Sequence, residues 1–529
     1  MKATPQRSMR LRRHGGWLTV ALVGLPLALV TPHAMADTVD PLERADGLRA
    51  DIDAILDDPA LAGATSGVVV THADTGEVLY SREADTGLLP ASNMKPFTAA
   101  AALEVLGPDH TFGTEAVVER RPGRGAVPEL YLVGGGDPTL NEEDLDSMAA
   151  DVAASGVTSV GELYADDTWF DEARLVDDWW PQDEPYAYSA QISALTVAHG
   201  DRYDTGVTEV TVTPGDAGEA VNVDPGAAEG YVELDNRAVT GPVGGGNTLT
   251  VDRPEGTNTI VVTGTLPIDA GPLVVLRTVD EPAGMAGHLF ARALEEHGVE
   301  VEGGVARGAV PQEWHRPRVV AEHTSMSLEE VLVPLMKFSN NGHSEMLVKS
   351  IGRHTAGEGS WRAGLVGIEE ALRRMGVDTS DLVLNDGSGL SRGNLVTANT
   401  VVDLLTHAQD APWYQAWHHS LPVAGDRDPF IGGTLTSRMG GTAAEGVVQA
   451  KTGTMTGVSA LSGYVQGPDG AELYFSVVNN GHSGGAPTHV QDALVVRLAE
   501  YLGHQALVSP RRGAPAVGGE LECSWELTC

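Results

Sequence analysis

The stretch Ser92-Asn93-Met94-Lys95 begins a segment whose residue pattern turns from irregular to helical. An alanine-rich run follows as far as Leu106, where Gly107-Pro108 ends the helical pattern. Ser92 and Lys95 stand three positions apart at the start of this predicted helix, so both side chains are expected on one face. A serine becomes a good nucleophile when a neighbouring base takes its proton, and a buried lysine is such a base. The pair indicates nucleophilic chemistry, although a helix cap beside a solvated lysine would have the same sequence.

Lysine is rare in the chain, so each motif that contains one is informative. The five lysines are Lys2, Lys95, Lys337, Lys349 and Lys451. Lys451-Thr452-Gly453 falls within a predicted strand, and Ser339-Asn340-Asn341 precedes it in the chain. Taken singly, an edge strand with a glycine and a loop between two helices would explain these motifs. Together, in this order, they predict one site in which Lys451 is a second cation near Lys95 and Gly453 leaves room for a substrate backbone.

Segments at both ends of the chain have the patterns of one α/β domain. A hairpin is predicted over 66–81, and three successive strands over 446–454, 460–466 and 472–478. The predicted helices of this domain cover 92–106, 327–354, 362–374 and 490–501.

The middle of the chain differs from its ends. Residues 113–323 combine short β-branched runs with many Gly, Pro and Asp turn signals, and one helix is predicted over 283–296. We therefore predict a discontinuous domain over 37–112 and 324–508. The β-rich region 113–323 is inserted into it and divides into two nested domains.

The N-terminal segment 1–36 has the pattern of a secretory signal peptide. It contains five basic residues and no acidic residue, and the basic residues precede an apolar run over 17–30. Ala34-Met35-Ala36 then forms a cleavage site before Asp37. A retained membrane anchor is the alternative, but the run is shorter than the roughly 20 residues that span a bilayer. The sequence predicts export to the cell-wall space, with no integral membrane span after cleavage.

Composition excludes several classes of partner and site. The 529-residue chain has a net charge of −39, which argues against nucleic acid as a partner because phosphates would be repelled. Only two cysteines occur, Cys523 and Cys529, which excludes zinc ribbons and iron–sulfur clusters. They are expected to form a disulfide in a flexible tail over 509–529. No histidine-based metal motif is present, so we expect neither a metal nor a cofactor.

The three motifs in this order resemble the signature of penicillin-binding proteins and serine β-lactamases. More than 200 residues separate Lys95 from Ser339. This long β-rich insert is similar to that of class C low-molecular-mass penicillin-binding proteins of actinobacterial type, which are serine D-alanyl-D-alanine carboxypeptidases and endopeptidases. Further matches are the segments 386–391, 421–425 and 433–435. The resemblance covers about residues 45 to 505. It implies an α/β (α+β) penicillin-recognising domain with an antiparallel sheet flanked by helices.

The resemblance also implies a role for each motif residue. Ser92 would attack the penultimate D-alanine carbonyl of a peptidoglycan stem peptide, with Lys95 as general base. Ser339 and Lys451 would pass the proton to the leaving D-alanine. Asn341 would hold the donor amide, while Thr452 and Thr454, flanking Gly453, would bind the terminal carboxylate. The backbone N–H groups of Ser92 and Thr454 would form the oxyanion hole, and β-lactams would acylate the same serine.

A pocket for the donor side chain is implied in the same way. In actinobacterial relatives that side chain is meso-diaminopimelate, which ends in an ammonium and a carboxylate. Asp183 would pair with the ammonium and Arg392 with the carboxylate. The remaining expected pocket residues are Trp180, Tyr188, Ser388, Gly389 and Met455. The alternative is that Asp183 and Arg392 are ordinary surface charges.

Two other functions remain open on this fold. A class A β-lactamase would carry an added Glu-x-x-Asn after the second motif, and none follows Asn341. A non-catalytic penicillin-binding sensor would have no need of three intact motifs, and turnover of labelled penicillin distinguishes it from a peptidase.

Overall fold

The two ends of the described chain meet in one antiparallel sheet. The computed structural model describes residues 41–120 and 125–506, and residues from Ala45 onward form a single unit. The sheet has five strands in the order β19-β20-β21-β1-β2. Their bounds are Val448–Met455 (β19), Val458–Gln466 (β20), Glu472–Asn480 (β21), Thr65–His72 (β1) and Val78–Arg82 (β2). The strand carrying Lys451 is therefore an edge strand, and the segment 422–424 pairs with the outer side of its first residues, 448–450.

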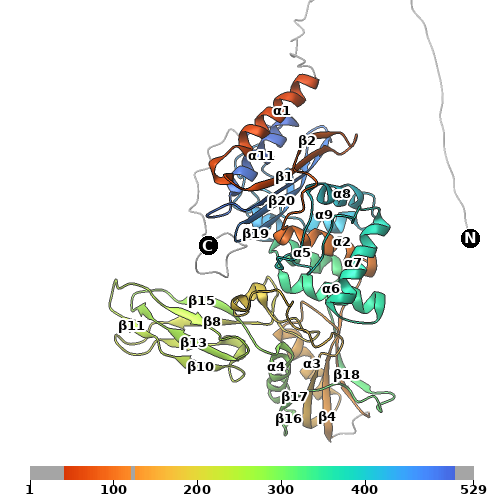
Figure 1. The fold of residues 1–529 in the computed structure, drawn as a ribbon. Coiled ribbons are helices and arrows are strands. Elements are labelled where there is room, and N and C mark those ends of the chain that lie inside the picture. The colour runs from red at the N-terminus through yellow and green to blue at the C-terminus, as the bar shows by residue number, and fades with distance from the viewer. Residues whose placement is uncertain (1–40, 121–124, 507–529) are drawn as a thin grey trace, which may run out of the picture. The chain divides into compact units, whose positions relative to one another are not determined.

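Helices cover both faces of this sheet, as Figure 1 shows. On one face lie α1 (Pro41–Leu56) and α11 (Thr488–Tyr501), whose buried Leu48 and Leu494 share an apolar core with Val477 of β21. On the other face, Val69 of β1 belongs to the core that surrounds α2 (Lys95–Leu106). Strand residues alternate between the two cores because successive side chains point to opposite faces.

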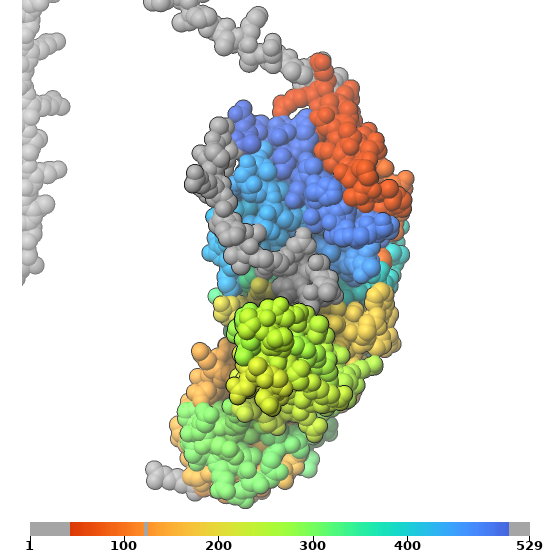
Figure 2. All heavy atoms as spheres, turned by 90° about the vertical axis from the view of Figure 1, so that its left-hand side faces the viewer, coloured from red at the N-terminus to blue at the C-terminus, as the bar shows by residue number. Residues whose placement is uncertain are grey.

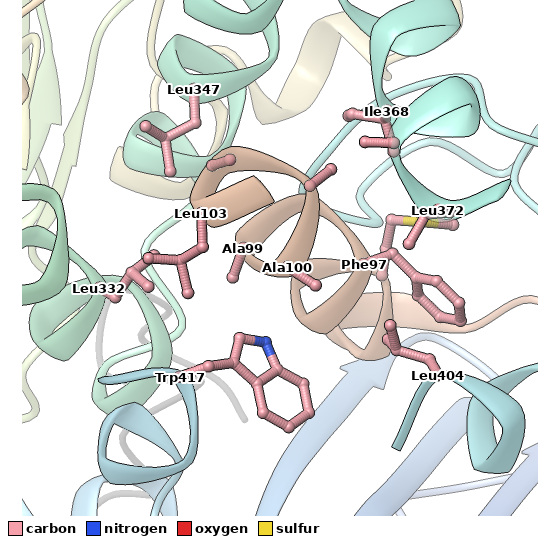
Figure 3. Packing of buried hydrophobic residues seen from close by; sticks show 14 of the residues in the cluster. Phe97, Ala99, Ala100, Leu103, Leu332, Leu347, Ile368, Leu372, Leu404 and Trp417 are labelled. Atoms are coloured by element: carbon pink, nitrogen blue, oxygen red, sulfur yellow. The ribbon is translucent and has the colours of Figure 1, made fainter. Parts of the chain in front are cut away.

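Helix α2 is the centre of the second core, as Figure 3 shows. Its alanines and Leu103 are fully buried, and Trp417 and Leu372 pack around it. Small side chains let neighbouring helices approach α2 closely, which fixes the helix that begins at Lys95. The surrounding helices are α5 (Leu328–Lys337), α6 (Asn341–Ala356), α7 (Trp361–Met375), α8 (Ala398–Ala408) and α9 (Tyr414–Ser420), with the short α10 (Pro429–Gly432) nearby.

A second sheet, in the inserted region, has six strands. Its order is β16-β5-β4-β3-β18, and β17 also pairs with β5. The bounds are Glu300–Val301 (β16), Val157–Asp166 (β5), Gly125–Gly134 (β4), Gly113–Val118 (β3), Arg318–Thr324 (β18) and Val305–Arg307 (β17). Helices α3 (Glu142–Ala154) and α4 (Pro282–Glu296) pack together and contribute to the core of this sheet.

The remaining strands lie between residues 198 and 278 and form several small sheets. Figure 2 shows the side chains of this segment, in yellow to light green, gathered in one lobe. We call it the β lobe. Its strands are Ala198–His199 (β6), Asp204–Thr205 (β7), Val207–Thr213 (β8), Asn222–Asp224 (β9), Glu233–Asn236 (β10), Val239–Gly241 (β11), Thr250–Asp252 (β12), Thr259–Thr263 (β13), Thr265–Pro267 (β14) and Leu273–Thr278 (β15).

The predicted α+β class with an antiparallel sheet and flanking helices is confirmed, but two local expectations were wrong. Helix α3 lies in a region predicted to hold only one helix. Its Asn141 capping box gives a start signal, but the pattern was read as part of the β-rich region. The helix predicted over 327–354 is broken at Phe338–Asn340.

The predicted signal peptide and the Cys523–Cys529 tail lie outside the described residues. No helix within 41–120 and 125–506 combines the length and apolarity needed to cross a bilayer.

Candidate active site

Ser92 lies in a tight turn rather than in the helix itself. Residues Ala91–Met94 form a 3-10 turn, and α2 begins at Lys95, with Pro96 in its first turn. Proline suits this place because the first helical N–H groups have no partner within the helix. The side chain of Lys95 still returns to Ser92, with 2.9 Å between Lys95 Nζ and Ser92 Oγ. The expected serine–lysine pair is thus formed in three dimensions.

Lys95 is fully buried and is held by two further acceptors. Its Nζ donates to Asn341 Oδ1 at 2.6 Å and to the backbone oxygen of Ser388 at 2.9 Å. Asn341 in turn donates from Nδ2 to the backbone oxygen of Tyr188 at 2.7 Å. Burial disfavours the charged ammonium relative to the neutral amine. The site thereby combines the first two motifs with the segment that carries Tyr188.

Ser339 lies at the break between α5 and α6. Its backbone has a φ of +60°, which is rare for a residue with a side chain and is typical of functional sites. Lys451 on β19 is fully buried, and its Nζ donates to Ser339 Oγ at 2.9 Å and to the backbone oxygen of Thr452 at 2.9 Å. A second serine–lysine pair therefore stands beside the first, since Ser339 is two residues from Asn341.

Strand β19 and the Ser92 turn are in direct contact. Asn93 Nδ2 donates to the backbone oxygen of Lys451 at 3.1 Å. A Cβ atom on Gly453 would come within 2.8 Å of the backbone oxygen of Pro90, so only glycine permits this approach. We expected Gly453 to leave room for substrate. The space where a side chain would project is taken by the turn, and room for a substrate backbone along the strand stays a prediction.

The threonines of the third motif lie along the edge strand. Thr452 Oγ1 donates to Thr434 Oγ1 at 2.8 Å, while Thr454 is half-buried. The loop that presents Thr434 is tied down by the buried Lys337, whose Nζ donates to the backbone oxygens of Leu421 and Ile431. Burial lowers the pKa of Lys337 to about 8. Thr434 belongs to the matched segment 433–435, but neither it nor Lys337 was expected as a site residue, because nothing local links them to Thr452.

The expected donor-pocket residues also come together, from three separate segments. The Arg392 guanidinium lies 4.9 Å from the centre of the Trp180 ring and donates to the backbone oxygen of Thr456 at 2.9 Å. Burial raises the pKa of the Asp183 carboxyl, opposed by a hydrogen bond with Tyr188 and by the charge of Arg392. Arg392 is therefore near enough for its charge to act on the Asp183 carboxyl, and a shared pocket for the two residues stays a prediction.

Three other expected residues border this pocket through the backbone. Met455 ends β19 directly before Thr456, whose carbonyl accepts from Arg392. Ser388 supplies the carbonyl that Lys95 contacts. Gly389 has a φ of +89°, and a Cβ there would lie 1.8 Å from the backbone oxygen of Ala91. The 386–391 loop thus touches both the Ser92 turn and Lys95.

Two buried carboxylates hold this loop. Asp386 begins the matched segment 386–391 but was not expected as a site residue, and Glu345 was not expected at all. Glu345 accepts hydrogen bonds from the backbone N–H of Ser388 at 2.7 Å and from Trp361 Nε1 at 2.7 Å. Asp386 accepts from the backbone of Gly389 and from Trp179 Nε1. Burial, with the nearby Asp386 charge as the second cause, raises the pKa of Glu345 to about 7. No motif signals Glu345, because its partners Trp361 and Ser388 lie 16 and 43 residues away in the chain.

A buried histidine beside the site makes stability depend on pH. His343 on α6 is fully buried, and its Nε2 donates to the backbone oxygen of Tyr203 at 2.8 Å. Burial lowers the pKa of His343 to about 4, from an ordinary 6.5. Between these values the unfolded chain binds a proton that the folded chain does not, so folding is weakened as the pH falls from about 6.5 to about 4.

We expect a His343→Gln variant to lose less stability in acid than the parent protein does. The amide can still donate to the Tyr203 carbonyl but has no proton to gain. By linkage, the histidine should account for about 2 kcal/mol of the loss between about pH 7.5 and pH 5. Thermal or urea unfolding at the two pH values measures this. The same substitution at the exposed His419 is the control, and equal acid sensitivity in all three proteins would contradict the prediction.

Comparison with known proteins agrees with this geometry. The chain is 67% identical, over the full length of both sequences, to a D-alanyl-D-alanine carboxypeptidase of Actinomadura sp. (strain R39). It is 28% identical to carboxypeptidase DacB of Mycolicibacterium smegmatis, covering 80% of this chain and 78% of the relative. Its fold matches the crystal structure of penicillin binding protein 4 from Haemophilus influenzae with a TM-score of 0.74, at 23% identity, over 85% of this chain and 99% of that one. The model of the D-Ala-D-Ala carboxypeptidase 3 (S13) family matches residues 48–501, and the chain belongs to this family.

Proposed function

We propose that this protein is a serine D-Ala-D-Ala carboxypeptidase that cleaves peptidoglycan stem peptides, and peptide cross-links, through an acyl-enzyme on Ser92. The observation that carries the proposal is the double serine–lysine arrangement. Lys95 Nζ lies 2.9 Å from Ser92 Oγ, and Lys451 Nζ lies 2.9 Å from Ser339 Oγ. One pair supplies a nucleophile with its base, and the other supplies a route for the proton to the leaving group.

The hydrogen bonds of Lys95 support its role as general base. As a neutral amine it keeps two N–H donors, and these match the two acceptors Asn341 Oδ1 and Ser388 O. The lone pair is then directed at Ser92, whose hydroxyl donates its proton as Oγ bonds to the carbonyl carbon of the penultimate D-alanine. The bond to the terminal D-alanine breaks, and its nitrogen receives a proton through Ser339 and Lys451. Water then hydrolyses the ester.

Two further groups of atoms are suited to stabilise the reacting peptide. The backbone N–H groups of Ser92 and Thr454 form the proposed oxyanion hole, since the turn and β19 meet at Gly453. Thr452, supported by Thr434, and Thr454 bind the terminal carboxylate. Asn341 binds the donor amide. A β-lactam mimics this peptide, acylates Ser92 and leaves an ester that hydrolyses slowly.

Release of D-alanine from a diacetyl-lysyl-D-alanyl-D-alanine tripeptide tests the activity directly. Steady release together with slow turnover of labelled penicillin is the result expected for a peptidase. Rapid turnover of penicillin without D-alanine release would instead identify a β-lactamase. A stable penicillin adduct with no peptide hydrolysis would identify a sensor.

We further propose that the donor side chain is of the meso-diaminopimelate type. The proximity of Asp183, Arg392 and the Trp180 ring supports a pocket that accepts a side chain ending in a zwitterion. Asp183 would pair with the ammonium and Arg392 with the carboxylate, while Tyr188, Ser388, Gly389 and Met455 would complete the walls.

Replacing Asp183 or Arg392 by alanine is expected to lower kcat/KM for a diaminopimelyl peptide by roughly 30-fold to a few thousand-fold. Loss of one partner of a desolvated ion pair costs about 2–5 kcal/mol, and about 1.4 kcal/mol corresponds to a factor of ten. The tripeptide with an acetylated lysine lacks both charges and should be affected much less. Penicillin acylation should hardly change. Equal losses on both peptides would mean that the two residues act structurally.

We also propose that the protein is exported and has the domain organisation given by its motifs. The small-residue cleavage site before Asp37 supports removal of residues 1–36 as a signal peptide, and N-terminal sequencing of the protein recovered from culture medium tests it.

The penicillin-recognising domain then comprises 37–112 and 324–508, with 113–323 inserted and 509–529 as a tail. The separate hydrophobic core of the inserted region supports this division.

A further inference from the structure

We propose that Arg253, in the β lobe, is a positioning residue for donor side-chain recognition. It acts through a buried ion pair with Glu184, the residue that follows Asp183 in the chain. The inference deepens the proposed function, because it rests on Asp183 lying in the donor pocket. It also assigns a task to the β lobe, which contributes no motif residue to the reaction.

The ion pair between Arg253 and Glu184 is withdrawn from solvent. Arg253 is fully buried and Glu184 is 4% exposed, with 2.8 Å between Arg253 Nη2 and Glu184 Oε1. The other guanidinium donors are used within the β lobe, by Thr278 Oγ1 and by the backbone oxygen of Thr257 at 2.7 Å. Such a pair contributes little net stability but holds its two ends in one geometry. It therefore fixes Glu184 relative to the β lobe.

The backbone beside Glu184 is attached to the same place. Thr278, the last residue of β15, donates from its N–H to the backbone oxygen of Pro185 at 3.2 Å and from its hydroxyl to that of Glu184. Arg253 contacts this hydroxyl as well. One arginine thus secures both the side chain and the main chain immediately after Asp183.

A second arginine supports the other end of the segment. The Arg277 guanidinium lies 5.2 Å from the centre of the Tyr186 ring, and Tyr186 stacks on Tyr188 with 5.7 Å between ring centres and 3° between planes. Arg277 is itself anchored by hydrogen bonds to the backbone oxygen of Val251 at 2.9 and 2.6 Å. The β lobe therefore contacts this segment at Glu184, Pro185 and Tyr186, between Asp183 and Tyr188.

The pocket has two halves that different parts of the fold supply. Arg392 follows the 386–391 loop of the penicillin-recognising domain, whereas Asp183 is carried by the segment that Arg253 secures. Recognition of a zwitterion requires both charges at a set separation. Displacement of a positioned group by about 1 Å can reduce catalysis by about 100-fold. Arg253 contacts neither Ser92 nor Lys95. The segment meets the reaction centre at Tyr188, whose carbonyl accepts from Asn341, and that end of the segment is supported by Arg277 rather than by Arg253.

The test compares two peptides in the full-length protein carrying Arg253→Met. Activities are expressed per active site, titrated with labelled penicillin, so that partial unfolding does not distort them. We expect kcat/KM for the diaminopimelyl peptide to fall at least about tenfold, mainly through KM. The diacetyl-lysyl tripeptide and the rate of penicillin acylation should change less than about threefold. Arg253→Lys, which keeps the charge, should recover part of the lost selectivity.

Two further variants make the result decisive. Arg307→Met removes another arginine of the inserted region, paired with Asp167 at 2.8 Å, and should leave the ratio of the two peptides unchanged. Glu184→Gln keeps the shape of the acid without its charge and should lose selectivity several-fold. If Arg253→Met does not fold, Glu184→Gln and Arg253→Lys decide alone. Unchanged selectivity in the folded Arg253 and Glu184 variants overturns the inference. Asp183→Ala is measured in the same assay. If it loses activity mainly on the diaminopimelyl peptide, the proposed pocket is correct even when the inference about Arg253 fails. If it loses activity equally on both peptides, the pocket itself is wrong.

Discussion

Replacing Ser92 by alanine is expected to remove covalent labelling by penicillin and to lower peptidase activity by roughly 10⁴- to 10⁶-fold. Ser92 Oγ lies 2.9 Å from Lys95 Nζ, and no acyl-enzyme can form without that oxygen. The fold should persist, because the serine lies in a short turn and alanine fits the same backbone. Intact mass and peptide mapping after penicillin treatment measure the labelling, and thermal unfolding measures the fold.

A buried serine elsewhere provides the matched control. Ser420, at the end of α9, is fully buried and donates from Oγ to the backbone oxygen of Trp417 at 2.6 Å, so Ser420→Ala should keep stoichiometric labelling. Ser339→Ala should give an intermediate result, since it removes a proton route and leaves the nucleophile. A stoichiometric adduct that survives in Ser92→Ala would falsify the assignment of the nucleophile.

Replacing Lys95 by alanine is expected to slow penicillin acylation by several orders of magnitude. General-base catalysis alone supplies roughly 10²- to 10⁴-fold. The variant also leaves Asn341 Oδ1 and the Ser388 carbonyl without their lysine donor, which loosens the site further. Stopped-flow or quenched measurement of the acylation rate, per folded molecule, checks this.

Lys349 is the matched control for Lys95. It is another fully buried lysine of the same domain, and it donates to Asp171 Oδ1 at 2.6 Å. Lys349→Ala should lower the free energy of unfolding, because it leaves buried groups unpaired, while each folded molecule still acylates at close to the parent rate. Near-normal acylation by a folded Lys95→Ala variant would show that the base lies elsewhere.

Local sequence was sufficient to predict a helix or strand wherever its residues have a clear periodicity and turn residues mark its ends. The strands that became β19, β20 and β21 were predicted within about two residues, because alternation and turn residues mark them. The segment 327–354 was read as helical throughout, since α5 and α6 are each amphipathic and the Phe338–Asn340 break is only three residues long. Helix α3 was missed because its surroundings are rich in turn signals.

The motif residues could be named from sequence, but the geometry of the site could not. Spacing within S-x-x-K already predicts Ser92 near Lys95, although Ser92 lies in the 3-10 turn that precedes α2 rather than in the predicted helix. Nothing in the sequence indicates that Gly453 meets the backbone of Pro90, or that Glu345 holds the N–H of Ser388. These contacts join segments that are far apart in the chain and depend on how the helices and strands pack.

The sequence by itself determined the family, the fold class and the three motifs, because each depends on residue types at short spacing. Only the tertiary structure decided which distant segments hold the motif residues and the donor-pocket residues in place. Arg253 lies 69 positions after Glu184, and Asn341 lies 246 positions after Lys95. A hydrogen bond over such a separation leaves no periodicity in the sequence. It exists because folding brings the two segments together and burial removes water as a competing partner.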